Sequence, residues 1–296
     1  MTVFEGVLPP IPTPFHDDYS INEEVLRSLV EHLTLEGVHG IIPTGSTGEF
    51  TRLSMDERKQ VLEICVDQVR GRIPVIAGTA AAGTREVIEL SRHAEAAGAK
   101  GFQIVAPFYA TLNDVEVYDH FRRIAESVRI PIMVYNNPRS TGIDMSPRLI
   151  ARLAEMPNVT AVKEASGDSR RVRQIIALTD EDFTVCAGVD FNTLESFALG
   201  AKGWVAGTAN LIPGQCVEFY EAAVLREDYE AARTLYYDMG DLCDKMETGG
   251  NAQNVKAALE IMGFPVGPPR PPLLPRDEAE REEIGALLDA VLKVRA

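Results

Sequence analysis

A lysine at the end of a short apolar run is well placed for covalent chemistry. Lys163 closes the run 159–163, whose β-branched and apolar residues follow the break Pro157-Asn158 and predict a strand. Burial in a strand would lower the pKa of the ammonium group and make the amine a nucleophile, able to form a Schiff base with a carbonyl. The alternative is a structural lysine that pairs with a carboxylate. Glu164 is the nearest candidate, but neighbours in a strand point to opposite faces, so it is a poor partner.

A polar turn, residues 44–49 with the sequence Thr-Gly-Ser-Thr-Gly-Glu, follows an earlier apolar run. Its two glycines allow a tight turn in which several backbone amides point one way, and Ser46 and Thr47 add hydroxyl donors. Such a concavity suits a carboxylate or a phosphate. The turn is not a P-loop, because no Gly-Lys-Ser/Thr follows it. An ordinary loop capped by Ser and Thr is equally compatible with the pattern.

Two tyrosines also stand where apolar runs end. Tyr109 belongs to the segment 107–109, and Tyr135 precedes Asn136-Asn137-Pro138. A tyrosine at a strand end can relay a proton, or it can be an amphipathic core residue. For either tyrosine alone, the sequence favours the core interpretation.

The apolar runs that carry these residues alternate with stretches of helical periodicity, which predicts parallel βαβ units. Eight runs at a spacing of roughly 30 residues predict a closed α/β fold, the (β/α)8 TIM barrel. A doubly wound open sheet would more often carry a glycine-rich phosphate turn after its first strand, where this chain has Pro12-Thr13-Pro14-Phe15. The predicted strands are residues 7–11, 40–43, 73–77, 101–106, 130–135, 159–163, 183–187 and 203–206.

Helices are expected between these strands, and two have clear start signals. Ser54 with Glu57 forms a capping box, and Ser146 precedes Pro147 at a first helical position. The predicted helices are residues 22–36, 55–70, 84–97, 114–128, 147–155, 169–178 and 191–199.

The strand signal stops after about residue 211. The segments 213–226, 228–246, 252–262 and 277–294 have helical patterns, and 263–275 is a proline-rich connector. We therefore expect two regions. Residues 1–211 would form the barrel with the active site, and residues 212–296 a C-terminal helical appendage that could also serve oligomer contacts.

Composition narrows the functional classes. The chain has 296 residues, of which 45% are hydrophobic and 25% charged, as in an ordinary globular enzyme. Its net charge of −15 opposes non-specific binding to nucleic acid or to an anionic membrane. The cysteines Cys65, Cys186, Cys216 and Cys243 are scattered, so neither a zinc site nor a disulfide framework is indicated. No signal-peptide pattern and no apolar run of membrane-spanning length is seen, so a cytoplasmic location is expected.

Five short motifs occur in order at the predicted strand ends. They are Gly45–Glu49, Tyr135-Asn136-x-Pro138 with Gly142, Val162–Gly167, Gly188-Val189-Asp190 and Gly207–Asn210. Their combination resembles the dihydrodipicolinate synthase / N-acetylneuraminate lyase family of class I aldolases. The resemblance covers nearly the whole chain, including the Pro/Gly-rich segment 267–275.

The resemblance implies that Lys163 forms a Schiff base with pyruvate or a related 2-oxo acid, with Tyr135 as the general acid/base beside it. It implies that Thr47 links Tyr135 to Tyr109, which would reach in from a neighbouring subunit. No metal or organic cofactor is implied, since the protonated imine itself is the electron sink.

The resemblance also implies how the 2-oxo acid is held and how the chain assembles. Ser46 and Thr47 would bind the carboxylate with their amides, while the Gly188 loop and the carbonyl of Val205 would line the pocket. A homotetramer built from two tight dimers is the implied assembly.

Three positions depart from the well-known members of this family. The synthases carry an arginine two residues after the proline, where this chain has Ser140, and its arginine, Arg139, comes one residue earlier. The first of the usual paired tyrosines is Phe108, and Ala165 replaces a threonine that the sialic-acid lyases often have. The residues expected to bind pyruvate therefore match the family. Those expected to bind the second substrate match neither the synthases nor the sialic-acid lyases.

The leading hypothesis is a Schiff-base lyase or synthase of the 4-hydroxy-tetrahydrodipicolinate synthase type. A 4-hydroxy-2-oxo acid aldolase, a sugar-acid lyase or dehydratase, and a hydroxyproline-pathway deaminase are alternatives within the family. A non-catalytic 2-oxo acid binder would be expected to lack Lys163 or Tyr135, and both are present. A phosphate-binding barrel enzyme would rest on the 44–49 turn alone.

Overall fold

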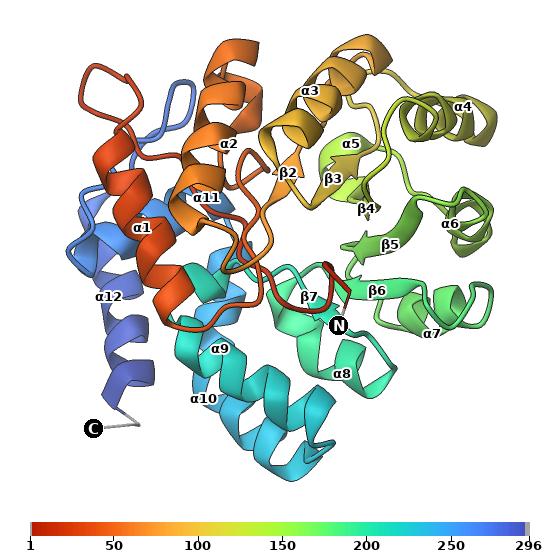
Figure 1. Cartoon of the computed structure of the whole chain (residues 1–296). Coiled ribbons are helices and arrows are strands. Elements are labelled where there is room, and N and C mark those ends of the chain that lie inside the picture. Colours follow the sequence, from red (N-terminus) through yellow and green to blue (C-terminus); the bar gives the residue numbers. More distant parts are fainter. Residues whose placement is uncertain (1, 294–296) are drawn as a thin grey trace.

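A parallel sheet forms the centre of the molecule, whose computed structural model describes residues 2–293. Its seven strands follow one another as β1-β7-β6-β5-β4-β3-β2, and each pair of neighbours is parallel. Figure 1 shows the helices arranged around this curled sheet. The α/β prediction is confirmed. The strands are β1 (Gly6–Val7), β2 (Ile76–Gly78), β3 (Gly101–Val105), β4 (Ile132–Asn136), β5 (Val159–Glu164), β6 (Thr184–Ala187) and β7 (Gly203–Trp204).

The strand that we predicted at residues 40–43 is not formed, so the described chain has seven strands rather than eight. This segment makes only isolated bridges, Ile42 with Pro10 on the β1 side and Ile41 with Val75 on the β2 side. It therefore lies between the two end strands of the sheet. Proline has no N–H to donate, and Pro10 and Pro43 interrupt the ladder here.

Helices follow the strands as the sequence predicts, with ends within a few residues of the expected ones. Ser54 and Glu57 form the predicted capping box, and the Ser146 side chain caps the helix that begins at Pro147. The short helix α5 (Pro138–Thr141) was not predicted. The others in this part of the chain are α1 (Glu23–Leu35), α2 (Met55–Val69), α3 (Thr84–Ala97), α4 (Asp114–Ala125), α6 (Pro147–Ala154), α7 (Arg170–Ile176) and α8 (Thr193–Ala198), with 3-10 turns η1 (Phe50–Arg52), η2 (Asp190–Asn192) and η3 (Thr208–Asn210).

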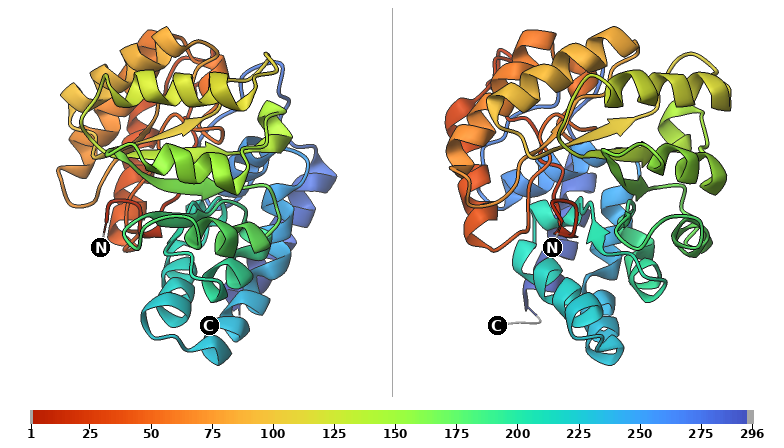
Figure 2. Two further views of the ribbon diagram at one scale, coloured as in Figure 1. Left: turned by 90° about the vertical axis from the view of Figure 1, so that its right-hand side faces the viewer. Right: turned by 45° about the vertical axis from the view of Figure 1, so that its right-hand side comes forward.

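The C-terminal region is helical, as predicted. It consists of α9 (Pro213–Tyr220), which continues into the π-helical η4 (Glu221–Leu225), then α10 (Tyr229–Glu247), α11 (Asn251–Ile261) and α12 (Glu278–Lys293). The last residue of the final predicted helix, Val294, lies outside the described residues. These helices gather on one side of the sheet (Figures 1 and 2). One apolar cluster extends from Val7 to Val291, so the C-terminal helices share a core with the strands. The division at residue 211 stays a prediction.

Side chains alternate between two cores along the strands. On β3, Phe102 and Ile104 belong to the large cluster that packs against the helices. On β4 and β5, Met133 and Ala161 belong to a separate cluster on the opposite, inner face. Because of this alternation, the residue two positions further along each strand also faces inward, and it lies nearer the carboxyl end of the sheet.

The structure also bears on the cysteines and on membrane insertion. Cys65, Cys186, Cys216 and Cys243 are all free and buried. Within residues 2–293, no helix combines the length and the apolar character that crossing a membrane requires.

Candidate active site

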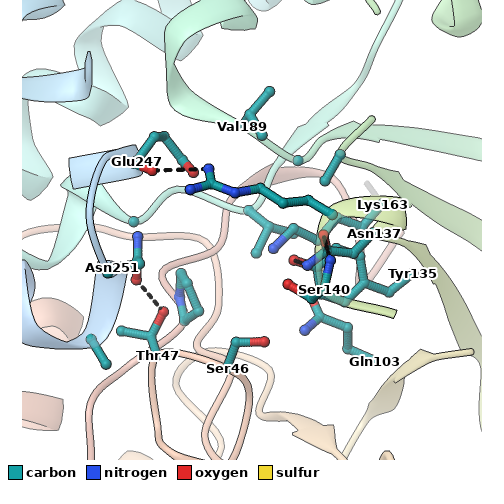
Figure 3. Close-up of a pocket in the computed structure, with 18 of the residues that line it drawn as sticks. Ser46, Thr47, Gln103, Tyr135, Asn137, Ser140, Lys163, Val189, Glu247 and Asn251 are labelled. Carbon is teal, nitrogen blue, oxygen red and sulfur yellow. Dashed lines mark hydrogen bonds between the residues drawn. The ribbon is translucent and has the colours of Figure 1, made fainter. Parts of the chain in front are cut away.

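A cavity of about 430 Å³ opens at the carboxyl ends of the strands (Figure 3). This is the end of a parallel α/β sheet at which ligands usually bind. The predicted residues that line it are Ser46, Thr47, Tyr135, Lys163, Gly188 and Val205. Tyr109 does not line it. The tertiary structure thus brings together residues that are spread over 160 positions of the sequence.

Lys163 and Tyr135 are paired across neighbouring strands. They are register partners on β5 and β4, and the Lys163 Nζ lies 4.1 Å from the centre of the Tyr135 ring. Only 6% of Lys163 and 7% of Tyr135 is exposed to solvent. A buried amine beside a phenol has the two functions that imine formation requires, a nucleophile and a proton carrier.

Glu164 does not pair with Lys163, as the alternation of strand side chains predicted. Its carboxylate accepts hydrogen bonds from the Asn136 Nδ2 at 3.1 Å and from the Ser166 amide at 2.8 Å. The Arg171 guanidinium lies 3.7 Å away. Burial raises the pKa of Glu164, and these partners oppose the shift. Lys163 therefore does not form a salt bridge with Glu164, the nearest candidate partner in the sequence.

The hydroxyl of Tyr135 is held in place by the start of the next loop. It accepts a hydrogen bond from the Asn137 Nδ2 at 2.8 Å, and Asn137 also caps α5 with its Oδ1. Within residues 2–293 the hydroxyl donates no hydrogen bond in return, so it can donate one to a ligand. Asn137 was not among the predicted site residues, although it lies in the motif after β4.

The turn at residues 44–49 presents Ser46 and Thr47 to the cavity. Its geometry needs left-handed backbone at Thr44 and Glu49, with φ of 56° and 58°. A side chain on Gly48 would meet the Ile11 carbonyl and the Thr44 amide at 3.0 Å, which explains the glycine there. The Thr47 hydroxyl donates a hydrogen bond to the Asn251 Oδ1 at 2.6 Å. The link from Thr47 to Tyr135 stays a prediction.

The C-terminal helices supply lining residues that the sequence analysis missed, Glu247 and Asn251 among them. Glu247 ends α10 and Asn251 begins α11, and both face the cavity from the side opposite Lys163 and Tyr135 (Figure 3). The only sequence signal for them is the break Gly249-Gly250 between two helical patterns. A break between helices does not indicate which way its flanking side chains point.

Two acidic groups lie near this wall. Burial raises the pKa of Glu247 to about 7; Asp190 adds to the shift and Lys163 opposes it. Asp190 is fully buried and accepts hydrogen bonds from the Trp204 indole at 2.8 Å and the Thr208 amide at 2.8 Å. The cavity thus contains a carboxyl group that titrates near neutral pH. Within residues 2–293, no group of three or more His, Cys, Asp and Glu side chains is arranged to hold a metal ion.

Arg139 and Ser140 both line the cavity, on α5. The Arg139 Nη1 donates a hydrogen bond to the Glu247 backbone carbonyl at 3.3 Å, so the guanidinium reaches the end of α10. The arginine that the sequence places one residue early therefore still points across the site.

Tyr109 projects away from the rest of the chain. It is fully exposed, and its backbone is in the left-handed region with a φ of 83°. It lies in the loop between β3 and α4. Large exposed aromatic side chains are typical of surfaces that another chain covers.

Comparisons with known proteins agree on one family. The profile of the Dihydrodipicolinate synthetase family matches residues 3–291. A 4-hydroxy-tetrahydrodipicolinate synthase of Methanopyrus kandleri is 44% identical over 98% of this chain and 95% of that protein. The corresponding protein of Archaeoglobus fulgidus is 37% identical over 98% of this chain and 99% of its own length. The crystal structure of dihydrodipicolinate synthase from Aquifex aeolicus matches with a TM-score of 0.94 and 33% identity, covering 97% of each chain.

Proposed function

Because this chain belongs to the dihydrodipicolinate synthetase family, we propose that it is a Schiff-base lyase of the 4-hydroxy-tetrahydrodipicolinate synthase type. It acts on pyruvate or a related 2-oxo acid and forms or breaks a C–C bond through an imine on Lys163. The observation that carries this proposal is the buried Lys163 amine, 4.1 Å from the ring of Tyr135 at the bottom of a cavity.

The reaction needs only groups that the chain provides. The Lys163 amine attacks the ketone carbon, and the carbinolamine that results takes up a proton and loses water to give a protonated imine. The imine draws electron density from the adjacent carbon, which loses a proton and then attacks the carbonyl carbon of the second substrate. Tyr135 carries protons to and from these intermediates, and no metal or organic cofactor is required.

The remaining roles follow from the lining of the cavity. Ser46 and Thr47 hold the carboxylate of the 2-oxo acid with their hydroxyls and amides, while Gly188 and the carbonyl of Val205 line the pocket. Thr47 passes protons between Tyr135 and Tyr109 once Tyr109 of a neighbouring subunit is in place. This assignment is supported by the position of Thr47 on the cavity and by the exposure of Tyr109.

The proposed assembly and architecture are those of the family. Residues 40–43 act as the remaining strand of an eight-stranded (β/α)8 barrel, supported by the bridges that they make on both sides. Residues 1–211 form this barrel, and residues 212–296 form a helical region that lends it Glu247 and Asn251. The chain forms a homotetramer, a dimer of dimers, in the cytoplasm. Its partner is a small 2-oxo acid, and neither nucleic acid nor membrane is involved.

The second substrate carries a carboxylate, which Arg139 binds in place of the arginine that this chain lacks at position 140. The support is the reach of Arg139 across the cavity to the Glu247 carbonyl. An assay panel separates the synthase from the alternatives, which are the 4-hydroxy-2-oxo acid aldolase, the sugar-acid lyase or dehydratase, and the deaminase. Cleavage of 4-hydroxy-2-oxo acids without synthase activity would reassign the second substrate.

The imine itself is tested by trapping. The protein is incubated with pyruvate and borohydride, and intact mass with peptide mapping locates the reduced adduct. We expect modification at Lys163, none after Lys163→Ala, and an unchanged result after Lys202→Ala, which removes an exposed lysine. An unmodified Lys163 in the native protein would contradict the proposed function.

A further inference from the structure

The floor of the cavity carries a polar side chain to which no role has been given so far. Gln103 lies on β3, between Phe102 and Ile104, which face the helices. Side chains alternate along a strand, so Gln103 faces inward. It lines the cavity, and only 4% of it is exposed. Figure 3 shows it on the same side of the site as Tyr135.

The amide of Gln103 has no partner that accounts for its presence. Its Oε1 is fully buried and accepts no hydrogen bond from residues 2–293. Some other polar side chains around the site are paired, such as Thr47 with Asn251 and Asn137 with Tyr135. Buried polar atoms are nearly always hydrogen-bonded, so an unpaired amide on the wall of a cavity can take a hydrogen bond from a bound ligand.

Packing alone does not require a glutamine at this position. The register partners of Gln103 are Gly78 on β2 and Met133 on β4, and neither has a hydrogen-bonding side chain. A leucine or methionine would fill the same volume without an unpaired amide. A ligand that enters the cavity and hydrogen-bonds the amide would account for a glutamine at this position.

The position of the amide relates it to the 2-oxo acid. A Cβ on Gly45 would lie 3.6 Å from the Gln103 Nε2, so the amide borders the turn that carries Ser46. Val105 is the register partner of Tyr135, and Gln103 comes two residues before Val105 on the same strand. Gln103 therefore lies one layer of inner side chains below the proposed reaction centre, toward the amino end of the strand. The carbonyl carbon of a bound 2-oxo acid has three substituents. The Lys163 nitrogen replaces the carbonyl oxygen, and the turn at residues 44–49 holds the carboxylate. The third substituent, C3, therefore faces the floor of the cavity.

We propose that Gln103 is a specificity-determining residue that hydrogen-bonds a hydroxyl group on C3 of the 2-oxo acid. The site then accepts a 3-hydroxylated 2-oxo acid as its imine-forming substrate in addition to pyruvate. A hydroxyl both donates and accepts, so it pairs with either end of the amide, whereas a carboxylate cannot pair with Oε1 and a methyl group pairs with neither. This inference rests on the proposed imine at Lys163.

The test compares two ligands that differ at one atom position. 3-Hydroxypyruvate and 2-oxobutyrate are trapped with borohydride over a range of concentrations, and half-saturation for the Lys163 adduct is measured for each. The measured quantity is the ratio of the two values, in the native protein and in Gln103→Leu. Intrinsic differences in reactivity between the ligands cancel when the two ratios are compared. Gln174→Leu makes the same change at an exposed position of α7 and is the matched control.

We expect Gln103→Leu to shift this ratio by roughly 2- to 10-fold against 3-hydroxypyruvate, the effect of one neutral hydrogen bond. Gln174→Leu should leave the ratio unchanged. Gln103→Met, which copies the neighbouring Met133, is measured as well and replaces the leucine variant if that protein does not fold. An unchanged ratio in a variant that still forms adducts would overturn this inference alone. Absence of any adduct in the native protein would instead overturn the imine chemistry and this inference with it.

Discussion

Tyr135 and Lys163 are brought together by strand register, and their side chains lie in a cavity that excludes most solvent. The Tyr135 hydroxyl accepts a hydrogen bond from the Asn137 Nδ2 at 2.8 Å. At the scale of single residues, the proposed chemistry depends on one amine and one phenol.

Removing the phenol should slow imine formation without removing the nucleophile. We expect Tyr135→Phe to lower the rate of adduct accumulation with pyruvate by roughly 10²- to 10⁴-fold, the usual contribution of a positioned acid/base. The rate is followed by intact mass in the presence of borohydride. Tyr237→Phe, at a 73% exposed tyrosine of α10, is the matched control. An equal rate in Tyr135→Phe and the native protein would exclude the acid/base role.

Glu247 should make stability depend on pH near neutrality. Its pKa in the folded protein is about 7, against an ordinary value of 4.5, because burial and Asp190 disfavour its charge. The protonated form is favoured on folding, so this contribution to stability is complete below pH 4.5 and is lost as pH rises through 7. The surrounding charged groups are Asp190, Lys163 and Arg139.

We therefore expect the free energy of unfolding of Glu247→Gln, relative to that of the native protein, to be higher at pH 8 than at pH 5. The change should be on the order of 1–3 kcal/mol, from denaturant unfolding at both pH values. Glu282→Gln removes an exposed glutamate of α12 and controls for net charge. A difference that is the same at both pH values would contradict the raised pKa.

At the scale of elements, the turn that presents Ser46 and Thr47 is attached to the C-terminal helices by buried charges. Glu49 ends the turn, and its carboxylate lies 2.9 Å from the Lys256 Nζ of α11. It also accepts a hydrogen bond from the Arg270 amide at 2.9 Å. Lys256 is 2% exposed, and burial lowers its pKa to about 8 although Glu49 opposes the shift. The ion pair therefore joins two elements that both reach the cavity.

Breaking this pair should destabilise the chain and disturb the carboxylate subsite. Lys256→Met leaves a buried carboxylate unpaired, so we expect a loss of about 3–5 kcal/mol in denaturant unfolding and a higher KM for the 2-oxo acid. The double variant Lys256→Met with Glu49→Gln should lose less free energy of unfolding than the two single variants lose together. Lys59→Met, which removes a more exposed pair with Glu89, should cost up to about 1 kcal/mol. Strict additivity would show that the two groups do not interact.

At the scale of the whole molecule, one predicted catalytic residue is missing from the cavity of its own chain. Tyr109 is fully exposed, which fits a side chain that completes the site of a neighbouring subunit. Subunit complementation tests this. Tyr109→Phe and Lys163→Ala are each expected to have low activity, and co-refolded hybrids should regain it, because a Tyr109→Phe subunit then receives Tyr109 from its partner. Sedimentation velocity checks that both variants assemble. Hybrids as inactive as the parents would place Tyr109 outside the catalytic site.

Much of this architecture could be predicted because it is encoded locally. The alternation of apolar runs and helical periods predicted the parallel α/β fold, and Ser54 and Ser146 marked helix starts correctly, since a cap depends on residues three or four positions apart. The segment 40–43, predicted as a strand, forms only isolated bridges, for the opposite reason. Its composition favours a strand, but prolines on it and on its neighbour remove the donors of a ladder.

Residue type and order along the chain singled out Lys163, Tyr135 and the polar turn, because the combination of motifs that contains them resembles a known family, although each alone was compatible with a structural role. Contacts between distant segments were not encoded in that way. The approach of Glu247 and Asn251, the anchoring of Glu49 by Lys256 and the burial of the Gln103 amide depend on how the C-terminal helices and neighbouring strands pack. Hydrophobic periodicity shows that a helix is buried on one side, but it does not determine which surface that side meets, and these residues could be assigned only from the packed molecule.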